Sequence, residues 1–383
     1  MALWFSASAV LPQLTKEWSL GNAAQAWLTM SVQIGFVLGA LISAITNLSD
    51  RIDTRRLFAV CAFGGALLTA WIAFFDVGPA GAFLLRILVG VCLAGVYPPG
   101  MKLMATWCKE DRGLGIGLLV GALTVGSALP HLLNAVPFFG QAGMPPWRAV
   151  LQTTSVSAIV SGLLVLFFVR PGPYLSAAAP FNWRFALEVF KQRSTRLANF
   201  GYLGHMWELY AMWTWVPLLL IDSYGRAGWD ISSARLAGFF AIAIGGVGCV
   251  LAGIMGDRLG RTTTTIASLV ISGLCCLLVG AVWTSPGLLT IVCLIWGFAV
   301  VADSAQFSTA VSELIDPRYT GTALTIQTSI GFLLTMVTIQ IIPLMKEMLG
   351  WEWVFALLAI GPIFGIWAMM QLRSMPESSR LAS

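Results

Sequence analysis

Long apolar segments separated by short polar connections make up most of the chain. Because a helix rises about 1.5 Å per residue and the hydrocarbon layer of a membrane is about 30 Å thick, about 20 apolar residues can span it. The apolar residues do not alternate with polar ones, which indicates helices rather than strands. We count twelve segments, which cover approximately residues 1–15, 24–48, 57–76, 79–105, 113–136, 147–170, 196–221, 234–256, 263–283, 286–314, 319–345 and 351–373.

The composition supports a membrane protein. Of the 383 residues, 58% are hydrophobic and 10% are charged, whereas soluble domains carry about a quarter charged residues. Six of the seven cysteines lie in apolar segments and none shows metal-ligand spacing, so we interpret them as small buried hydrophobic residues. We therefore predict an all-α membrane protein with twelve transmembrane helices and expect no metal and no cofactor.

The second half of the chain repeats the first at one nearly constant offset. Four landmarks of the first half recur 204 to 207 residues later, and the pairs are Asp50 with Asp257, Arg112 with Arg318, Trp147 with Trp351, and Pro12 with Pro217. Two halves of six helices with the same orientation are a known transporter plan. We predict an N-terminal six-helix half over residues 1–170 and a C-terminal six-helix half over residues 196–383.

The connection between the two predicted halves, residues 171–195, differs from the other loops. It is rich in proline at first and then basic and amphipathic, which predicts a linker with a helix on the membrane surface. The repeat also shows that the first segment is short. It has eleven residues before Pro12, whereas the seventh has about 20 before Pro217. We therefore expect about ten apolar residues of the first helix to be missing from this sequence.

The basic residues are distributed unevenly between the two sides of the predicted membrane. Arg86 lies inside a segment, and five of the other Lys and Arg residues fall on one side: Lys16, Arg148, Arg226, Arg235 and Lys346. The remaining sixteen of the 22 fall on the other side, which the positive-inside rule places in the cytoplasm. This bias predicts a multi-pass inner-membrane protein with both termini in the cytoplasm. The positive charge indicates contact with lipid headgroups rather than nucleic acid.

Two polar stretches stand out against this apolar background. The stretch GIMGDRLGR, Gly253 to Arg261, packs three charges and three glycines into nine residues, and NLSDRIDTRR, which starts at Asn47, is a degraded copy. Glycines permit a tight turn and close approach of helices, and the charges can form a cluster that holds one side shut and then separates. We predict a gating role for these residues: Asp50, Arg51, Gly253, Asp257, Arg258, Gly260 and Arg261.

The glycine-rich stretch resembles the loop signature G-x-x-x-D-R-x-G-R of the major facilitator superfamily. The fourth segment, with LLRILVGVCLAGVYPPG, and the last, with GWEWVF, are also similar to that family. The resemblance covers the whole chain. It implies a secondary transporter that works by alternating access of two six-helix halves, without a cofactor and as a monomer, with helices seven and ten beside the central cavity.

Ionisable residues inside a membrane are costly and usually functional. Glu208 lies near the middle of the seventh segment and shares a helix face with His205, three residues earlier. Asp303 lies in the tenth segment. Burial favours the protonated form of a carboxylate, which can then load and release protons. We predict Glu208, Asp303 and His205 as proton-coupling residues, while a structural ion pair remains the alternative for each.

The predicted substrate-binding residues are other polar and aromatic side chains within the segments, and three of them, Arg86, His131 and Asn134, lie toward the outer side. Ser6, Ser8, Gln33, Asn134, Gln306 and Gln327 offer hydrogen bonds, Arg86 could oppose an anion or brace the outer gate, and His131 could act at a gate. Aromatic residues near Glu208 could stack on an organic substrate, and we name Trp207 and Tyr210.

Several functional classes remain open or are excluded. We expect proton-coupled symport of a small organic solute, with proton-driven efflux of drugs or metabolites as the alternative. The fifth segment reads GSALPHLL where drug exporters of the superfamily carry Gly-Pro, which counts against efflux. Neither segment two nor segment eight has an internal arginine, because Arg235 lies at one end of segment eight, and this excludes the nitrate porters. No GxxxxGK[ST] stretch supports ATP-driven transport. A channel or a membrane enzyme is less consistent with the repeated loops and with only two histidines.

Overall fold

The structure is a computed structural model, and it describes residues 1–383 except 47, 109–111, 136–146, 175–189, 317–319 and 382–383. All regular elements in this described part are helical. The first group, called the N-terminal helices, comprises α1 (Ala2–Ala9), α2 (Leu11–Trp18), α3 (Asn22–Thr46), α4 (Leu48–Arg51), α5 (Thr54–Phe74), α6 (Gly78–Ala94), α7 (Tyr97–Ala105), α8 (Arg112–Ala135) and α9 (Trp147–Phe168).

The second group, called the C-terminal helices, follows the linker region. It comprises α11 (Arg193–Arg226), α12 (Ile231–Ala243), α13 (Gly245–Leu259), α14 (Arg261–Leu278), α15 (Pro286–Ala302), α16 (Ser304–Leu314), α17 (Thr320–Trp353), η3 (Val354–Ala359), α18 (Ile360–Arg373) and η4 (Pro376–Arg380). The surface helix predicted within residues 171–195 falls mostly on 175–189, outside the described residues, so the division into two domains stays a prediction.

The described helices account for the predicted membrane crossings. Nine described helical stretches are long and apolar enough to cross a membrane. One of them, Thr320–Arg373, covers the last two predicted segments. The helix breaks between these two segments at Gly350, which has a φ of +63°. Helix α11 is 34 residues long but is not among the nine stretches, because its polar side chains make it less apolar. Helices α1 and α2 together cover the first predicted segment. The helical membrane fold predicted from the sequence is confirmed.

Several of the predicted segments are interrupted in the structure. The first divides into α1 and α2, the fourth into α6 and α7, the eighth into α12 and α13, and the tenth into α15 and α16. Prolines begin α2 and α7, where a missing amide hydrogen is tolerated in the first turn. The tenth segment breaks at Asp303, which leads into α16. Apolar length alone does not reveal such breaks.

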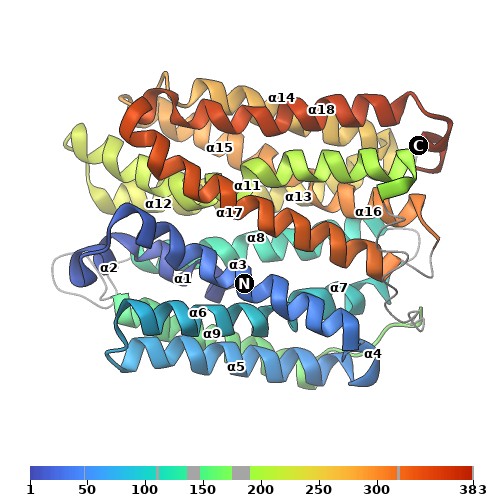
Figure 1. Ribbon diagram of the computed structural model, residues 1–383, viewed down its shortest axis with the longest axis horizontal. Helices are drawn as coiled ribbons and strands as arrows, with labels where there is room; N and C mark the ends of the chain where they lie inside the picture. The colour runs from blue at the N-terminus through green and yellow to red at the C-terminus, as the bar shows by residue number, and fades with distance from the viewer. Residues whose placement is uncertain (47, 109–111, 136–146, 175–189, 317–319, 382–383) are drawn as a thin grey trace.

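The two groups of helices lie side by side with their axes roughly along one direction. In Figure 1 most N-terminal helices form the lower part of the bundle and the C-terminal helices the upper part, and the N-terminus lies near the middle of the helix length. The most extensive contacts between the groups are those of α3 with α17 and of α8 with α12 and α13, and α8 also packs against α16 and α1 against α11. We call the boundary along these contacts the seam.

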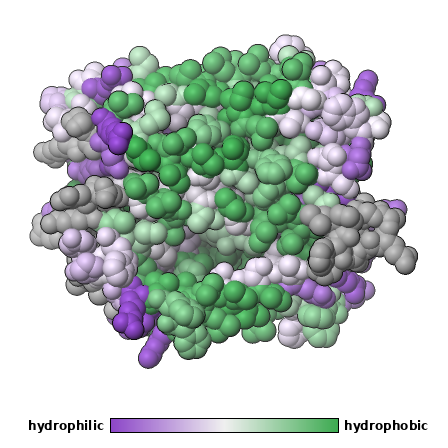
Figure 2. Space-filling view, turned by 180° about the vertical axis from the view of Figure 1, so that it is seen from behind, coloured by the Kyte–Doolittle hydropathy of each residue, from purple (hydrophilic) through white to green (hydrophobic). Residues whose placement is uncertain are grey.

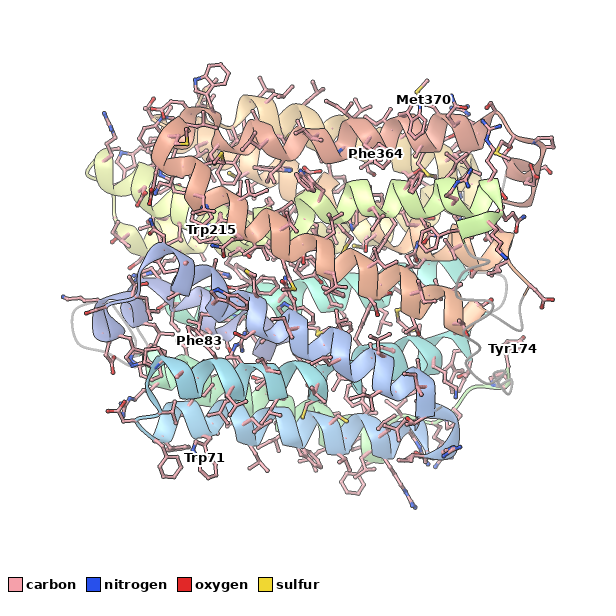
Figure 3. The ribbon with its side chains drawn as sticks, in the orientation of Figure 1. Trp71, Phe83, Tyr174, Trp215, Phe364 and Met370 are labelled. Carbon is pink, nitrogen blue, oxygen red and sulfur yellow. The ribbon has the colours of Figure 1, made fainter. Side chains whose placement is uncertain are left out.

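The outer surface of the bundle suits a lipid bilayer. Figure 2 shows a hydrophobic band across the middle of the molecule and hydrophilic residues toward both ends of the helices. Trp71 on α5 and Met370 on α18 are exposed and point outward (Figure 3). Since exposed apolar residues on this scale could not face water, the chain is an integral membrane protein.

Glycines allow the closest helix contacts within each group. A Cβ atom on Gly35 of α3 would lie 1.8 Å from the carbonyl oxygen of Ile87, and one on Gly90 of α6 would lie 2.0 Å from that of Val32. Among the C-terminal helices, a Cβ on Gly297 would lie 1.5 Å from the carbonyl oxygen of Ala241. Small residues of this kind hold membrane helices together at short backbone distances.

The two repeated loops turn by different means. Gly260 joins α13 to α14 with a φ of +89° and ψ of 150°, a conformation that side chains disfavour. The corresponding residue in the first loop is Asp53, which instead caps α5 by accepting hydrogen bonds from the amides of Arg55 and Arg56 at 3.0 and 3.1 Å. Its hydrogen bond with the Arg55 side chain lowers the pKa of Asp53. The degraded loop therefore remains a well-formed helix start.

We predict that Gly90→Ala destabilises the protein by about 1–3 kcal/mol, because the added methyl group forces α6 away from α3. Thermal unfolding of the purified protein in detergent measures the effect. Gly287→Ala in α15 is the matched control, since its Cβ would meet nothing within 4 Å. Equal unfolding temperatures for the two variants would contradict the prediction.

Candidate functional site

Six aromatic side chains meet across the seam at the centre of the bundle, and we call them the central aromatic cluster. Its members are Trp4, Phe5 and Phe36 from the N-terminal helices and Tyr210, Trp213 and Phe332 from the C-terminal helices. All six are buried. The ring centroids of Phe36 and Phe332 are 4.8 Å apart, those of Trp4 and Phe332 5.0 Å, and those of Phe5 and Trp213 5.6 Å. The cluster closes the middle of the seam.

Polar groups without partners lie within and beside this cluster. The indole nitrogens of Trp4 and Trp213 are buried and have no hydrogen-bond partner among the described residues. The same holds for both amide atoms of Gln33, which is 0% exposed. An unsatisfied buried polar group costs about 1–3 kcal/mol, so each one in a native structure needs an explanation. Together they make this region a candidate binding site for a polar ligand.

Arg86 on α6 is a buried cation held only by neutral groups. It donates hydrogen bonds to the carbonyl oxygen of Leu3 at 2.6 Å, to Oγ of Ser6 at 3.3 Å and to the carbonyl oxygen of Trp4. Its Nε atom has no partner, and within the described part of the chain it has no salt bridge. Because Trp4 is also part of the aromatic cluster, the cation and the rings form one continuous site.

The contacts between α3 and α6 set Arg86 and Gln33 at a similar depth. Gly35 of α3 lies against Ile87, the neighbour of Arg86. Gln33 is two residues from Gly35 and shares a helix face with Phe36 of the cluster. One turn after Trp4 on α1, Ser8 shares a hydrogen bond of 2.7 Å with Thr29 of α3. Of the predicted residues, Tyr210 thus belongs to the cluster, Arg86 and Ser6 contact each other next to Trp4, and Gln33 lies one helix turn from Phe36.

Glu208 lies inside the C-terminal helices and is fully hydrogen-bonded. Oγ of Ser272 donates to its carboxylate at 3.0 Å, the Cys276 thiol donates at 3.1 Å, and the indole of Trp296 also donates to it. These partners come from α14 and α15. The carboxylate is 1% exposed and no described basic residue forms a salt bridge with it, so the site can hold a proton.

His205 and Asp303 form a buried acid–base pair. Nδ1 of His205 lies 2.8 Å from Oδ1 of Asp303, and both side chains are 1% exposed. The His205 ring packs against Tyr202 and Phe307, and its Nε2 atom has no partner among the described residues. His205 therefore pairs with Asp303 rather than with Glu208. Nowhere in the described part do three or more His, Cys, Asp or Glu side chains gather as a metal site would require.

Arg261 organises a charged network at one end of the seam. Its guanidinium lies 2.7 Å from Asp257 and 3.1 Å from Glu313, and it donates to Gln306 at 2.9 Å. This network touches α8, since a Cβ on Gly113 would lie 2.4 Å from Oδ1 of Asp257. At the same contact, a Cβ on Gly253 would lie 2.8 Å from the carbonyl oxygen of Gly113. The glycine-rich stretch thus joins the C-terminal helices to α8.

The structure places the other predicted residues away from the central cluster or leaves them unassigned. Gln306 lies in the Arg261 network, and Trp207 donates to the carbonyl oxygen of Leu357 at 3.2 Å. Asn134 donates to the carbonyl oxygen of Ala9 at 2.7 Å, and His131 is buried on the same helix, α8. Gln327 is buried without a partner in the described part. Arg51 and Arg258 are exposed, and the side chain of Asp50 lies outside the described residues.

The sequence analysis missed several residues of these sites. Trp4, Phe36, Trp213 and Phe332 have no sequence signal that separates them from lipid-facing aromatic residues. Trp296 and Glu313 become visible only through their partners, Glu208 and Arg261.

Comparisons with known proteins agree with this architecture. The family model described as Major Facilitator Superfamily matches residues 1–339 and 200–383. The gallate transporter of Pseudomonas putida is 24% identical over 319 residues, which cover 74% of this chain and 68% of that protein. The benzoate transport protein of Acinetobacter baylyi is 22% identical over 303 residues, which cover 69% of this chain and 63% of that protein.

Solved structures show the same fold. The structure of a proton:xylose symporter bound to 6-bromo-6-deoxy-D-glucose superposes with a TM-score of 0.70 at 15% identity, over 97% of this chain and 93% of that one. The family model matches the whole chain, and the solved structure shares its fold over 97% of the chain. The chain therefore belongs to the major facilitator superfamily.

Proposed function

We propose that the chain is a secondary transporter of small aromatic carboxylic acids. The observation that carries this proposal is Arg86, a buried cation without a carboxylate partner in the described residues, placed beside the central aromatic cluster. A substrate carboxylate would supply the missing counter-charge, and the substrate ring would pack among the cluster side chains. Gallate and benzoate, named for two relatives, are both aromatic carboxylic acids.

Electrostatics makes a neutral or cationic substrate a poorer match. A buried charge is costly unless it is paired, and a bidentate contact between a guanidinium and a carboxylate is among the strongest available pairs. Arg86 holds its position through backbone oxygens of α1, so a carboxylate would find the guanidinium already oriented. The aromatic rings then add apolar contact and stacking.

Transport would be uptake coupled to protons, with Glu208 as the coupling carboxylate. The group has hydroxyl, thiol and indole donors but no basic partner among the described residues, so its charge state is free to change. The His205–Asp303 pair, on the same side of α11, would relay protons to and from this carboxylate. Symport suits an anionic substrate because the proton compensates its charge.

Alternating access would use the seam as its moving boundary. The Arg261 network closes one end of the seam, where Asp257 and Arg261 meet Gly113 of α8. Opening that end would move α8 away from Asp257 and Arg261 and expose their paired charges to water, which suits a switch between two states. In this scheme both termini and the network face the cytoplasm, the halves 1–170 and 196–383 move about the 171–195 linker, and the protein works as a monomer in the inner membrane.

Arg86→Gln is expected to lower uptake of labelled benzoate into proteoliposomes roughly 30-fold or more, because loss of a buried charge partner costs about 2–5 kcal/mol. Arg86→Lys should keep part of the activity, since it keeps the charge but not the planar contact. Exposed Arg226 supplies the control, Arg226→Gln. If Arg86→Gln transports benzoate at the wild-type rate, Arg86 does not bind the carboxylate.

Glu208→Gln is expected to abolish uphill accumulation driven by a pH gradient but to retain exchange of labelled for unlabelled substrate. The amide keeps hydrogen bonds to Ser272 and Trp296 but cannot release a proton. Both modes are measured in the same proteoliposomes, with Glu352→Gln at an exposed position as the control. Unchanged pH-driven accumulation would remove the coupling role.

Arg261→Gln is expected to loosen α8 from α13, because it leaves Asp257 and Glu313 without their cation. Labelling of Cys249, which is buried on α13 behind this contact, should then rise several-fold with a membrane-permeant maleimide. Site-resolved mass spectrometry measures it. Arg258→Gln, in the same loop but exposed, should leave labelling unchanged. An equal change in both variants would argue against the network as a gate.

A further inference from the structure

Gln33 is a buried amide that the protein itself leaves unsatisfied. The side chain is 0% exposed, and neither its Nε2 nor its Oε1 atom has a hydrogen-bond partner in the described part of the chain. An amide that stabilised the bundle would bind a backbone or side-chain group, as Gln25 on the same helix does when it donates to the carbonyl oxygen of Leu20 at 3.2 Å. An apolar residue would fill the position of Gln33 at lower cost.

The position of Gln33 relates it to the substrate region. It shares a face of α3 with Phe36. The ring centroid of Phe36 lies 5.1 Å from that of Trp4 and 4.8 Å from that of Phe332. The contact of Gly35 with Ile87 brings this part of α3 to the depth of Arg86. A ring held among Trp4, Phe36 and Phe332, with its carboxylate on Arg86, would therefore have the Gln33 amide within its surroundings.

The chemistry of the unsatisfied groups specifies what the ring must carry. An amide offers two donors and an acceptor, and a phenolic hydroxyl can accept from Nε2 and donate to Oε1 of the same group. The indole nitrogens of Trp4 and Trp213, also buried without partners, are further donors around the cluster. A plain hydrocarbon ring would leave all of these groups unpaired, whereas a ring hydroxyl can pair with the Gln33 amide.

We propose that Gln33 is a specificity-determining residue that selects aromatic acids with a ring hydroxyl over their unsubstituted analogues. This inference rests on the proposed function, because it assumes that an aromatic carboxylate binds at Arg86. The selection follows from an asymmetry of binding sites: a site built to hydrogen-bond a hydroxyl discriminates strongly against the analogue that lacks it, since its polar groups are then left buried and unpaired.

The test compares uptake of benzoate, 3-hydroxybenzoate, 4-hydroxybenzoate and 3,4-dihydroxybenzoate by the full chain in proteoliposomes. We expect kcat/KM for at least one hydroxylated acid to exceed that for benzoate roughly 10-fold or more. Gln33→Met keeps the length of the side chain and removes its hydrogen bonds. This variant should bring the ratio of kcat/KM for the hydroxylated acid to kcat/KM for benzoate close to one, mainly by lowering transport of the hydroxylated acid. Gln25→Met, the same change on the same helix, should preserve the ratio.

A second measurement separates recognition from a structural role. Because the Gln33 amide has no partner in the protein, Gln33→Met should unfold in detergent at the wild-type temperature or above it, in the absence of substrate. A lower unfolding temperature, together with an equal loss of transport for every acid, would show a structural role and overturn the inference.

The outcomes distinguish the two proposals. Uptake of benzoate and hydroxybenzoates with equal kcat/KM in the wild type overturns the role of Gln33 and leaves the proposed function in place. A wild-type protein that is folded but transports none of the aromatic acids overturns the proposed function itself. A hydroxyl preference that survives in Gln33→Met assigns the selection to other residues and also overturns the inference.

Discussion

The interior of a membrane bundle offers no water to its polar groups, and this constraint shapes every functional feature of the chain. Each buried polar atom must find a partner in the protein or in a ligand, since leaving it unpaired costs stability. Glu208 meets the constraint within the protein, through Ser272, Cys276 and Trp296. Arg86 and Gln33 do not meet it fully, because a guanidinium nitrogen and a whole amide remain unpaired in the described part. The difference separates the proposed proton site, which is complete within the protein, from the proposed substrate site, which is not.

Arg86 and Glu208 each take part in a contact made by the first helix of their own group, α1 or α11. Glu208 follows Leu3 by 205 residues, the same offset that relates Pro217 to Pro12, so the two occupy equivalent places in the two halves of the repeat. In the first half, Arg86 of α6 reaches the carbonyl oxygen of Leu3 on α1. In the second half, Trp296 of α15 reaches the carboxylate of Glu208 on α11. The contact of α6 with α1 thus holds a cation, and the contact of α15 with α11 holds an acid.

The sequence was a good guide to features that are costly or repeated, and a poor guide to features set only by packing. The helical membrane fold and the repeated loops could be recognised because charges and glycines are rare in apolar segments. Glu208, Asp303 and Arg86 stood out for the same reason. Trp4 and Trp71 could not be told apart, because both are aromatic residues in apolar segments, yet one is buried at the seam and the other faces outward. Gln306 was interpreted as a substrate residue because depth along the helix does not reveal its partner, Arg261.

The geometry of α11 suggests how protonation and substrate binding can influence each other in the proposed cycle. Glu208 and Tyr210 are two residues apart, so a helix with 3.6 residues per turn directs them to nearly opposite sides. Glu208 accordingly contacts α14 and α15, while Tyr210 packs on Trp4 across the seam. A change in the charge of Glu208 would alter how α11 packs on its own group, and the same rigid helix carries Tyr210 and Trp213 against the substrate region. Coupling then needs no direct contact between proton and substrate, because one helix bears both sites on opposite faces.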